Sequence, residues 1–390
     1  MNKRQLSLSL YINYFIHGFG MIILTQNMQA LSHHWQTPLA TVSYVVSGNG
    51  IGRLLAYFVL GNLSDYFGRK IFINVGMISY FTFFVGMAFV KNIQVAYMFS
   101  ILSGVAASAL DSGTYTTFVE MGKRGGSSNI LLKAFISIGE FILPLIISNL
   151  ESRQMWYGWS FILAAAILVI NFVFLNLQTF PERNLDDYET KVVNENLTKK
   201  SKALATVGLL GYGYTSMAVM ILYTQWISLF VRKTFGFSQS LSHWLLSLYS
   251  VGSITGVILI FLLLRQGVAE TKLLVSLNAL SLLALFVVCY SSVPFISMSA
   301  AFLFGFSAAG GVLQIGLNLF IKLYPHIKGR ITGSFFTFGS FAAFSIPIIT
   351  GWLSKKSVAN AIRFDLVVCA LGLFFVSLTA WALRNSKKEQ

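Results

Sequence analysis

Twelve stretches of about twenty mostly apolar residues follow one another along this 390-residue chain. They cover residues 6–30, 41–62, 71–90, 94–119, 129–149, 157–178, 204–230, 240–263, 272–290, 293–321, 331–352 and 362–383. A helix of about twenty residues crosses the hydrocarbon core of a bilayer. Only 11% of the residues are charged, against about 25% in soluble domains. The pattern therefore predicts an all-α membrane protein whose surroundings are the lipid bilayer.

One polar segment divides the series of apolar stretches into two sets of six. Residues 179–203 are rich in charged and amide side chains, whereas most of the other connections are short. We predict an N-terminal six-helix bundle at residues 1–178, a linker at 179–203 and a C-terminal six-helix bundle at 204–390.

The basic residues indicate how the chain is oriented. With both termini in the cytoplasm, 19 of the 28 Lys and Arg residues lie in predicted inner segments, as the positive-inside rule requires. This topology accounts for most of the net charge of +15, so we expect no nucleic-acid partner. Lys3 and Arg4 precede a long apolar stretch without a small-residue cleavage site, which predicts an uncleaved first span. We expect a multi-pass protein of the cytoplasmic membrane with a cytoplasmic linker.

The two halves of the sequence are related. MIILTQ at 21–26 matches MILYTQ at 220–225, and Gly52 matches Gly252 at a similar offset. LDSGTY at 110–115 lies over LQIGLN at 313–318. A repeat of about 200 residues predicts two bundles related by a pseudo-two-fold axis along the membrane normal.

A dense polar loop, GNLSDYFGRK, connects the second and third predicted spans. Gly61 permits close helix approach and Gly68 a tight turn, while Arg69 and Lys70 suit an inner loop. Asp65 needs a partner, and a helix N-terminus is one that favours an anion.

This loop resembles the signature loop of the major facilitator superfamily. The twelve spans and the central linker extend the resemblance over essentially the whole chain. The resemblance implies a secondary transporter. It also implies that Asp65 lies at the start of the eleventh span near Gly333, and that Arg69 pairs with Glu120. Together with Gly61, Gly68 and Lys70, these residues would form a latch on the cytoplasmic side. The alternative is a solvated turn whose charges only set topology.

Five ionisable side chains fall at membrane depth in the first half: His17, Arg53, Asp111, Lys133 and Glu140. Each is costly to insert and calls for an explanation. A buried carboxyl binds a proton readily, so Asp111 and Glu140 are candidates for proton coupling, with His17 a third. Arg53 can hold a substrate carboxylate or phosphate bidentately. The alternative is that Arg53 only neutralises Asp111 or Glu140 as a structural ion pair.

In the resembled family the first, fourth, seventh and tenth spans generally line a central cavity. The resemblance therefore implies that polar residues on these and neighbouring spans surround one site. The substrate-binding candidates are Asn13, His17, Arg53, Asp111, Tyr115, Lys133, Glu140, Tyr223, Gln225, Trp226, Gln314 and Asn318. The candidates in the second half of the chain, from Tyr223 onward, are all uncharged.

These charges favour a carrier of a small polar metabolite, either an organic acid or a sugar-like compound, coupled to protons or to sodium. The runner-up is a multidrug exporter. Against it, Ser100 stands where many proton-coupled members carry an arginine, and SIGEFILPLI lacks the drug antiporters' glycine-proline pattern. A membrane enzyme is less favoured, because we find no nucleophile motif, metal-ligand cluster or cofactor loop. We expect a monomer, with Cys289 and Cys369 acting as core residues.

Overall fold

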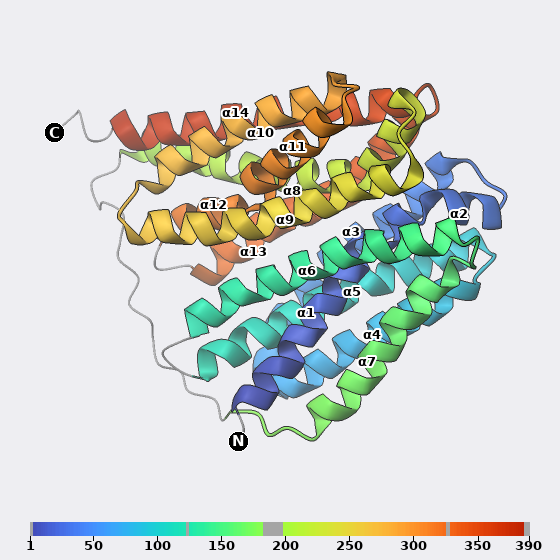
Figure 1. Cartoon of the computed structure of the whole chain (residues 1–390). Coiled ribbons are helices and arrows are strands. Elements are labelled where there is room, and N and C mark those ends of the chain that lie inside the picture. Colours follow the sequence, from blue (N-terminus) through green and yellow to red (C-terminus); the bar gives the residue numbers. More distant parts are fainter. Residues whose placement is uncertain (1–2, 122–124, 182–197, 325–327, 386–390) are drawn as a thin grey trace.

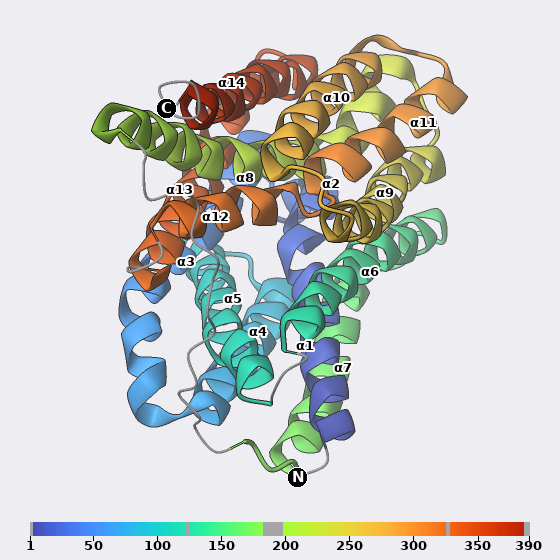
Figure 2. The same ribbon diagram turned by 90° about the vertical axis from the view of Figure 1, so that its left-hand side faces the viewer.

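The structure is a computed structural model that describes residues 3–121, 125–181, 198–324 and 328–385, with side chains left undescribed at 57–67, 116, 119–120, 125–130, 328–330 and 385. The regular structure of these residues is helical, and the helices form two bundles (Figure 1). Figure 2 shows the bundles one above the other, with α1 and α3 to α7 in one and α8 to α14 in the other. The short helix α2 contacts α1 and α3.

The first bundle contains α1 (Lys3–Gln26), α2 (Met28–His34), α3 (Leu39–Phe67), α4 (Arg69–Phe89), α5 (Ile93–Glu120), α6 (Gly125–Ser152) and α7 (Gly158–Asn176). The second contains α8 (Lys199–Phe235), α9 (Gln239–Arg265), α10 (Glu270–Tyr290), α11 (Pro294–Phe304), the π-helix η1 (Gly305–Ala309), α12 (Val312–Leu323), α13 (Lys328–Ser354) and α14 (Val358–Asn385). Helices α3 and α13 pack together, as do α6 and α9, and these two seams join the bundles.

Eleven helical segments in the described part of the chain are long and apolar enough to cross a membrane. They correspond to eleven of the twelve predicted spans. The remaining span is α3, whose 29 residues are also sufficient to cross a bilayer. The prediction of an all-α membrane protein with two six-helix bundles is confirmed.

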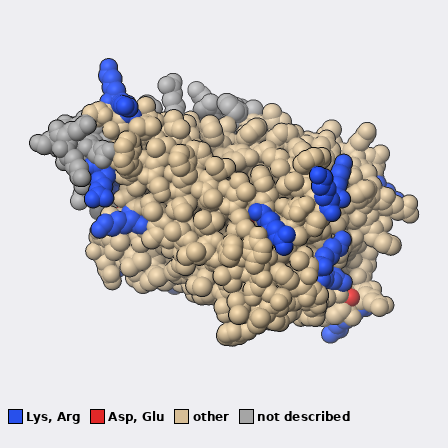
Figure 3. Space-filling model, turned by 90° about the horizontal axis from the view of Figure 1, so that it is seen from above, with Lys and Arg blue, Asp and Glu red and all other residues tan. Residues whose placement is uncertain are grey.

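The surface carries the apolar band that a lipid environment requires. In Figure 3, Lys and Arg lie mainly toward the two ends of the visible face, and little Asp or Glu appears. Large apolar side chains are exposed on α10 and α14, among them Leu283, Phe286, Val367, Phe374 and Trp381. Such contiguous exposed apolar surface is stable against lipid but not against water.

The predicted helix boundaries need three corrections. The first helix ends at Gln26, not at residue 30, and α2 is a separate short helix. Helix α8 begins at Lys199, five residues inside the predicted linker, because Thr198 caps it by accepting a hydrogen bond from the Ser201 backbone. The predicted span 293–321 is broken into α11, η1 and α12, because Gly311 adopts a φ of +92° that glycine tolerates.

The internal repeat is visible in how the helices touch. A Cβ added at Gly52 would clash with the Ile101 carbonyl of α5, and one added at Gly252 would clash with the Phe302 carbonyl of α11. In the same way, Gly104 lies against the Asn49 carbonyl and Gly305 against that of Tyr249. Each contact recurs about 200 residues later, so the pseudo-two-fold relation extends to individual close approaches.

Replacing Gly104 by alanine is expected to destabilise the protein by about 1–3 kcal/mol, because the methyl group has no room between α5 and α3. Thermal unfolding followed by size-exclusion chromatography measures the loss. The matched control is Gly333→Ala, where nothing lies within 4 Å of an added Cβ. Equal melting temperatures for the two variants would contradict the close approach.

Candidate functional site

A polar cluster lies within the N-terminal bundle, where α1, α3, α4 and α5 meet. The Tyr14 hydroxyl donates to Asp111 Oδ1 at 2.6 Å, and Arg53 Nη2 lies 4.0 Å from Asp111 Oδ2. His17 Nδ1 and the Tyr80 hydroxyl are 2.5 Å apart. Tyr14 and His17 are three residues apart and share one face of α1, which explains why both reach the cluster.

The cluster is closed on one side and more open on the other. His17 is 4% exposed and Tyr14 is fully buried. The Asp111 side chain is 18% exposed, and Tyr115, one turn further along α5, is 36% exposed and packs edge-on against Tyr14. An incoming solute would therefore meet the carboxylate and Tyr115 first. At 4.0 Å, Arg53 and Asp111 do not form a tight bidentate pair.

Glu140 lies on α6, beside this cluster but not bonded to it. It is 4% exposed, and its Oε2 has no hydrogen-bond partner among the described residues. Lys133, two turns earlier on α6, interacts electrostatically with both Glu140 and His17. Helix α1 covers Glu140 closely, since a Cβ on Gly139 would clash with the Phe15 carbonyl. A buried carboxyl with a free oxygen can take up a proton.

The structure brings only some of the other predicted site residues near this cluster. Asn13 is buried against α7 and accepts a hydrogen bond from Asn171 at 2.7 Å. Gln314 is exposed, and Asn318 donates to Glu270 at 2.5 Å. Asn318 is therefore engaged at the start of α10.

Three of the predicted substrate-binding residues lie within four positions of one another on α8 and are buried in the second bundle. The Tyr223 hydroxyl, Gln225 Oε1 and Trp226 Nε1 have no hydrogen-bond partner within the described part of the chain. The Tyr223 ring stacks on Tyr249 with centroids 5.0 Å apart. Gln225 Nε2 reaches across to the other bundle and donates to Ser43 on α3 at 2.5 Å.

A network of hydrogen bonds joins the bundles at the end of the molecule where α2 lies, which we call the α2 end. Gln26 on α1 donates to the Thr224 carbonyl at 3.1 Å and lies 3.2 Å from His243 Nδ1. His243 Nε2 is 2.9 Å from Glu151 Oε2 at the end of α6. These contacts, with the Ser43 and Gln225 pair, close the α2 end.

The closure follows the internal repeat. Gln26 and Gln225 are equivalent positions, and so are Ser43 and His243 at an offset of 200. Gln26 contacts His243 of the other bundle, and Gln225 contacts Ser43 of the other bundle. Equivalent positions therefore form both contacts. The glutamine meets the imidazole of His243 in one contact and the hydroxyl of Ser43 in the other.

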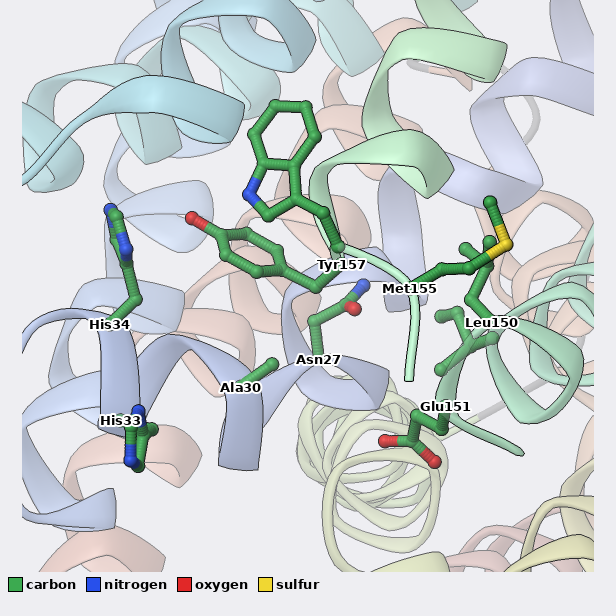
Figure 4. Close-up of a pocket in the computed structure, with 10 residues that line it drawn as sticks. Asn27, Ala30, His33, His34, Leu150, Glu151, Met155 and Tyr157 are labelled. Atoms are coloured by element: carbon green, nitrogen blue, oxygen red, sulfur yellow. The ribbon is translucent and has the colours of Figure 1, made fainter. Parts of the chain in front are cut away.

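A pocket of about 360 Å³ opens beside this network, between α2, α6 and the segment before α7. Its lining includes Asn27, His34, Glu151 and Tyr157 (Figure 4). The Tyr157 ring lies 5.5 Å from that of His34, and its hydroxyl donates to the Ala88 carbonyl at 3.1 Å. Burial raises the pKa of Tyr157 to about 12, so this hydroxyl stays a donor at physiological pH.

Comparison with known proteins agrees with this architecture. The model of the Major Facilitator Superfamily matches residues 10–347. The chain belongs to the major facilitator superfamily. It is 42% identical to the inner membrane transport protein YdiM of Escherichia coli over 98% of this chain and 95% of that protein. It is thus a multi-pass inner-membrane transporter and not an enzyme.

Solved structures of major facilitator proteins share the fold. The crystal structure of a D-xylose-proton symporter superposes with a TM-score of 0.78 and covers 97% of both chains at 12% identity. The nucleoside transporter NupG superposes with a TM-score of 0.73 and covers 98% of this chain and 99% of its own at 15% identity. At these identities the likeness establishes the fold alone.

The family's signature loop is partly described. Gly68 has a φ of +86° and links α3 directly to α4, a conformation that favours glycine. Lys70 Nζ donates to the Asn176 carbonyl at 2.9 Å at the end of α7. The packing around Gly61 and the side chains of Asp65 and Glu120 lie outside what the structure describes, and so do the pairings predicted for Asp65 and Arg69.

The equivalent loop of the second bundle carries an inverted ion pair. Glu270 occupies the position that corresponds to Lys70, and its Oε1 accepts from Lys322 Nζ at 2.7 Å. Lys322 lies in the last turn of α12, about where the repeat places Glu120. The charge at this position of the loop is thus reversed between the two copies, from Lys70 in the first to Glu270 in the second.

Sequence reasoning missed several residues of the site. Tyr14 and Tyr80 are hidden in apolar stretches, where a tyrosine cannot be distinguished from a core aromatic residue. Asp365 escaped notice because it lies close to the end of its span, yet it is fully buried. Asp365 thus adds a buried ionisable side chain in the second half to the five that were predicted in the first half.

Proposed function

We propose that this chain is a secondary active transporter that moves a small polar solute, an organic acid or a sugar-like compound, by alternating access coupled to protons. The observation that carries the proposal is the Arg53, Asp111 and Tyr14 cluster, with its partly exposed carboxylate, beside buried Glu140. Arg53 and Tyr115 would bind the solute, and Asp111 and Glu140 would carry the proton. Such a polar cluster suits a solute with hydroxyl or carboxylate groups better than an apolar drug.

The conformation is part of this proposal. We infer that both termini and the linker at 179–203 are cytoplasmic, that residues 1–178 and 204–390 are the rocking units, and that the transporter works as a monomer. The α2 end then faces outward, and the contacts of Gln26, Glu151 and His243 close it. The chain would thus be in an inward-facing state, in which Asp111 is reached from the cytoplasm.

The test is a thermal-shift screen of purified protein against pentoses, nucleosides, organic acids and cationic drugs. A ligand at one hundred times its Kd stabilises the folded protein by about 2.7 kcal/mol. Stabilisation by a polar solute, followed by its uptake into proteoliposomes under an imposed pH gradient, would support the proposal. Stabilisation by cationic drugs alone would indicate the multidrug exporter instead.

Replacing Arg53 by lysine is expected to weaken solute binding about tenfold, because lysine keeps the charge but loses the planar fork that holds a carboxylate or diol. The shift in melting temperature with solute measures the loss. Lys91→Ala, at an exposed position on the connection between α4 and α5, serves as the control. Equal stabilisation of Arg53→Lys and the parent protein would exclude a bidentate role.

Replacing Glu151 by alanine is expected to loosen the α2 end, because His243 and Gln239 both bond this carboxylate. Hydrogen bonds to a charged group contribute about 1.5–3 kcal/mol each. Because 1.4 kcal/mol changes an equilibrium constant tenfold, losing one such bond should lower the ratio of closed to open α2 ends about tenfold. Spin labels at exposed Gln36 and Ser240, on opposite bundles, would report a longer distance component. Arg153→Ala is the matched control, and an unchanged distance distribution in Glu151→Ala would show that the carboxylate does not hold the closure.

A further inference from the structure

Asp365 is a buried carboxyl that the proposed transport cycle does not use. It lies two turns into α14 and is fully buried. Neither of its carboxylate oxygens has a hydrogen-bond partner among the residues that the structure describes. Such a side chain calls for a physical explanation, since buried polar atoms are normally satisfied.

The groups around Asp365 do not supply a counter-charge. It interacts electrostatically with Tyr223 of α8, Tyr249 of α9, Cys289 of α10 and Cys369 of its own helix. The nearest basic residue in sequence, Arg363, is exposed, and its guanidinium lies over the Tyr290 ring at 5.2 Å. No described charged side chain offsets the burial of Asp365.

An ionised carboxylate in this setting would lack both solvent and a partner, which is among the costliest arrangements in a protein interior. A neutral carboxylic acid removes most of that cost, because it carries no net charge to desolvate. We propose that Asp365 is a proton-binding site of the C-terminal bundle, occupied in this conformation.

The site is connected to Glu140 across the seam between the bundles. Tyr249 interacts electrostatically with both Glu140 and Asp365, and its ring stacks on that of Tyr223. The Tyr223 hydroxyl has no hydrogen-bond partner in the described structure, and neither does Glu140 Oε2. A pair of stacked tyrosines thus separates two carboxyls that each retain bonding capacity. If the proposed proton coupling holds, Asp365 is a second proton carrier, on the bundle opposite Glu140.

Infrared spectroscopy of the full-length protein in lipid nanodiscs tests the site directly. Isotopic labelling of aspartate carboxyls separates their neutral carbonyl band from that of glutamates. Wild type at neutral pH is expected to show a neutral aspartic acid band that Asp365→Asn loses. Asp111→Asn, recorded alongside, separates the contribution of Asp111.

A second variant covers the case in which Asp365→Asn does not fold. Asp365→Glu keeps the carboxyl but should move its signal from the aspartate-labelled band to the glutamate band. An aspartate band that is the same in the wild type and in whichever variant folds would overturn the proposal. The measurement needs no transport, so an assigned band in a protein that shows no proton-linked uptake would leave the site standing and refute the coupling.

Discussion

Replacing Glu140 by glutamine is expected to abolish accumulation of solute against its gradient, while exchange down a gradient continues. Glutamine has the size of glutamate and can accept the same hydrogen bonds, but it cannot bind and release a proton. Glu140 is buried and interacts electrostatically with Lys133, so glutamine leaves this buried position without a titratable group. Accumulation in proteoliposomes under an imposed pH gradient should fall roughly tenfold or more, as expected when an essential proton-transfer group is lost.

The control for this experiment is on the same helix. Ser148→Ala removes a polar side chain two turns beyond Glu140. The Ser148 side chain makes no hydrogen bond in the described part of the structure. Its accumulation should match the parent protein. If Glu140→Gln still concentrates solute under the same gradient, Glu140 is not the coupling residue.

Replacing Asp111 by asparagine is expected to abolish solute binding and also to lower stability. Asparagine can still accept from Tyr14, but it leaves Arg53 without its carboxylate. Breaking a buried ion pair by removing one partner costs about 3–5 kcal/mol, and the 18% exposure of Asp111 lowers that figure. Melting temperature and thermal shift with solute measure the two effects separately.

A double variant decides between a structural and a functional pair. Arg53→Gln combined with Asp111→Asn removes both charges, so it should recover much of the lost stability. If the pair binds the solute, the double variant remains inactive in uptake. Recovery of uptake together with stability would mean that Arg53 and Asp111 only neutralise each other.

The spans were predictable because a bilayer imposes a length on every apolar helix, and that length is read directly from the sequence. The break at Gly310 and Gly311 was not predictable, because an apolar stretch reads the same whether its helix is continuous or jointed. The start of α8 was missed because its first turn is polar and resembles the linker before it.

The site was predictable in its charged members and in Tyr115, but not in its other tyrosines. Asp111 and Arg53 were identified because a charge at membrane depth is costly, and the structure places them together. Tyr14, Tyr80 and Asp365 could not be assigned in that way, since their environment depends on which helices meet. Glu151 and His243 lie near helix ends, where polar residues are common, and only the folded arrangement brings them into contact.

The exchanged contacts at the α2 end bear on the ancestry of the chain. Gln26 with His243 and Gln225 with Ser43 are two copies of one contact, as in an isologous interface between identical subunits. An ancestral six-helix protein could have closed the equivalent end as a homodimer with this contact twice. In a single chain each copy of the contact is free to diverge. His243 and its partner Glu151 therefore strengthen the contact with Gln26 without altering the contact between Gln225 and Ser43.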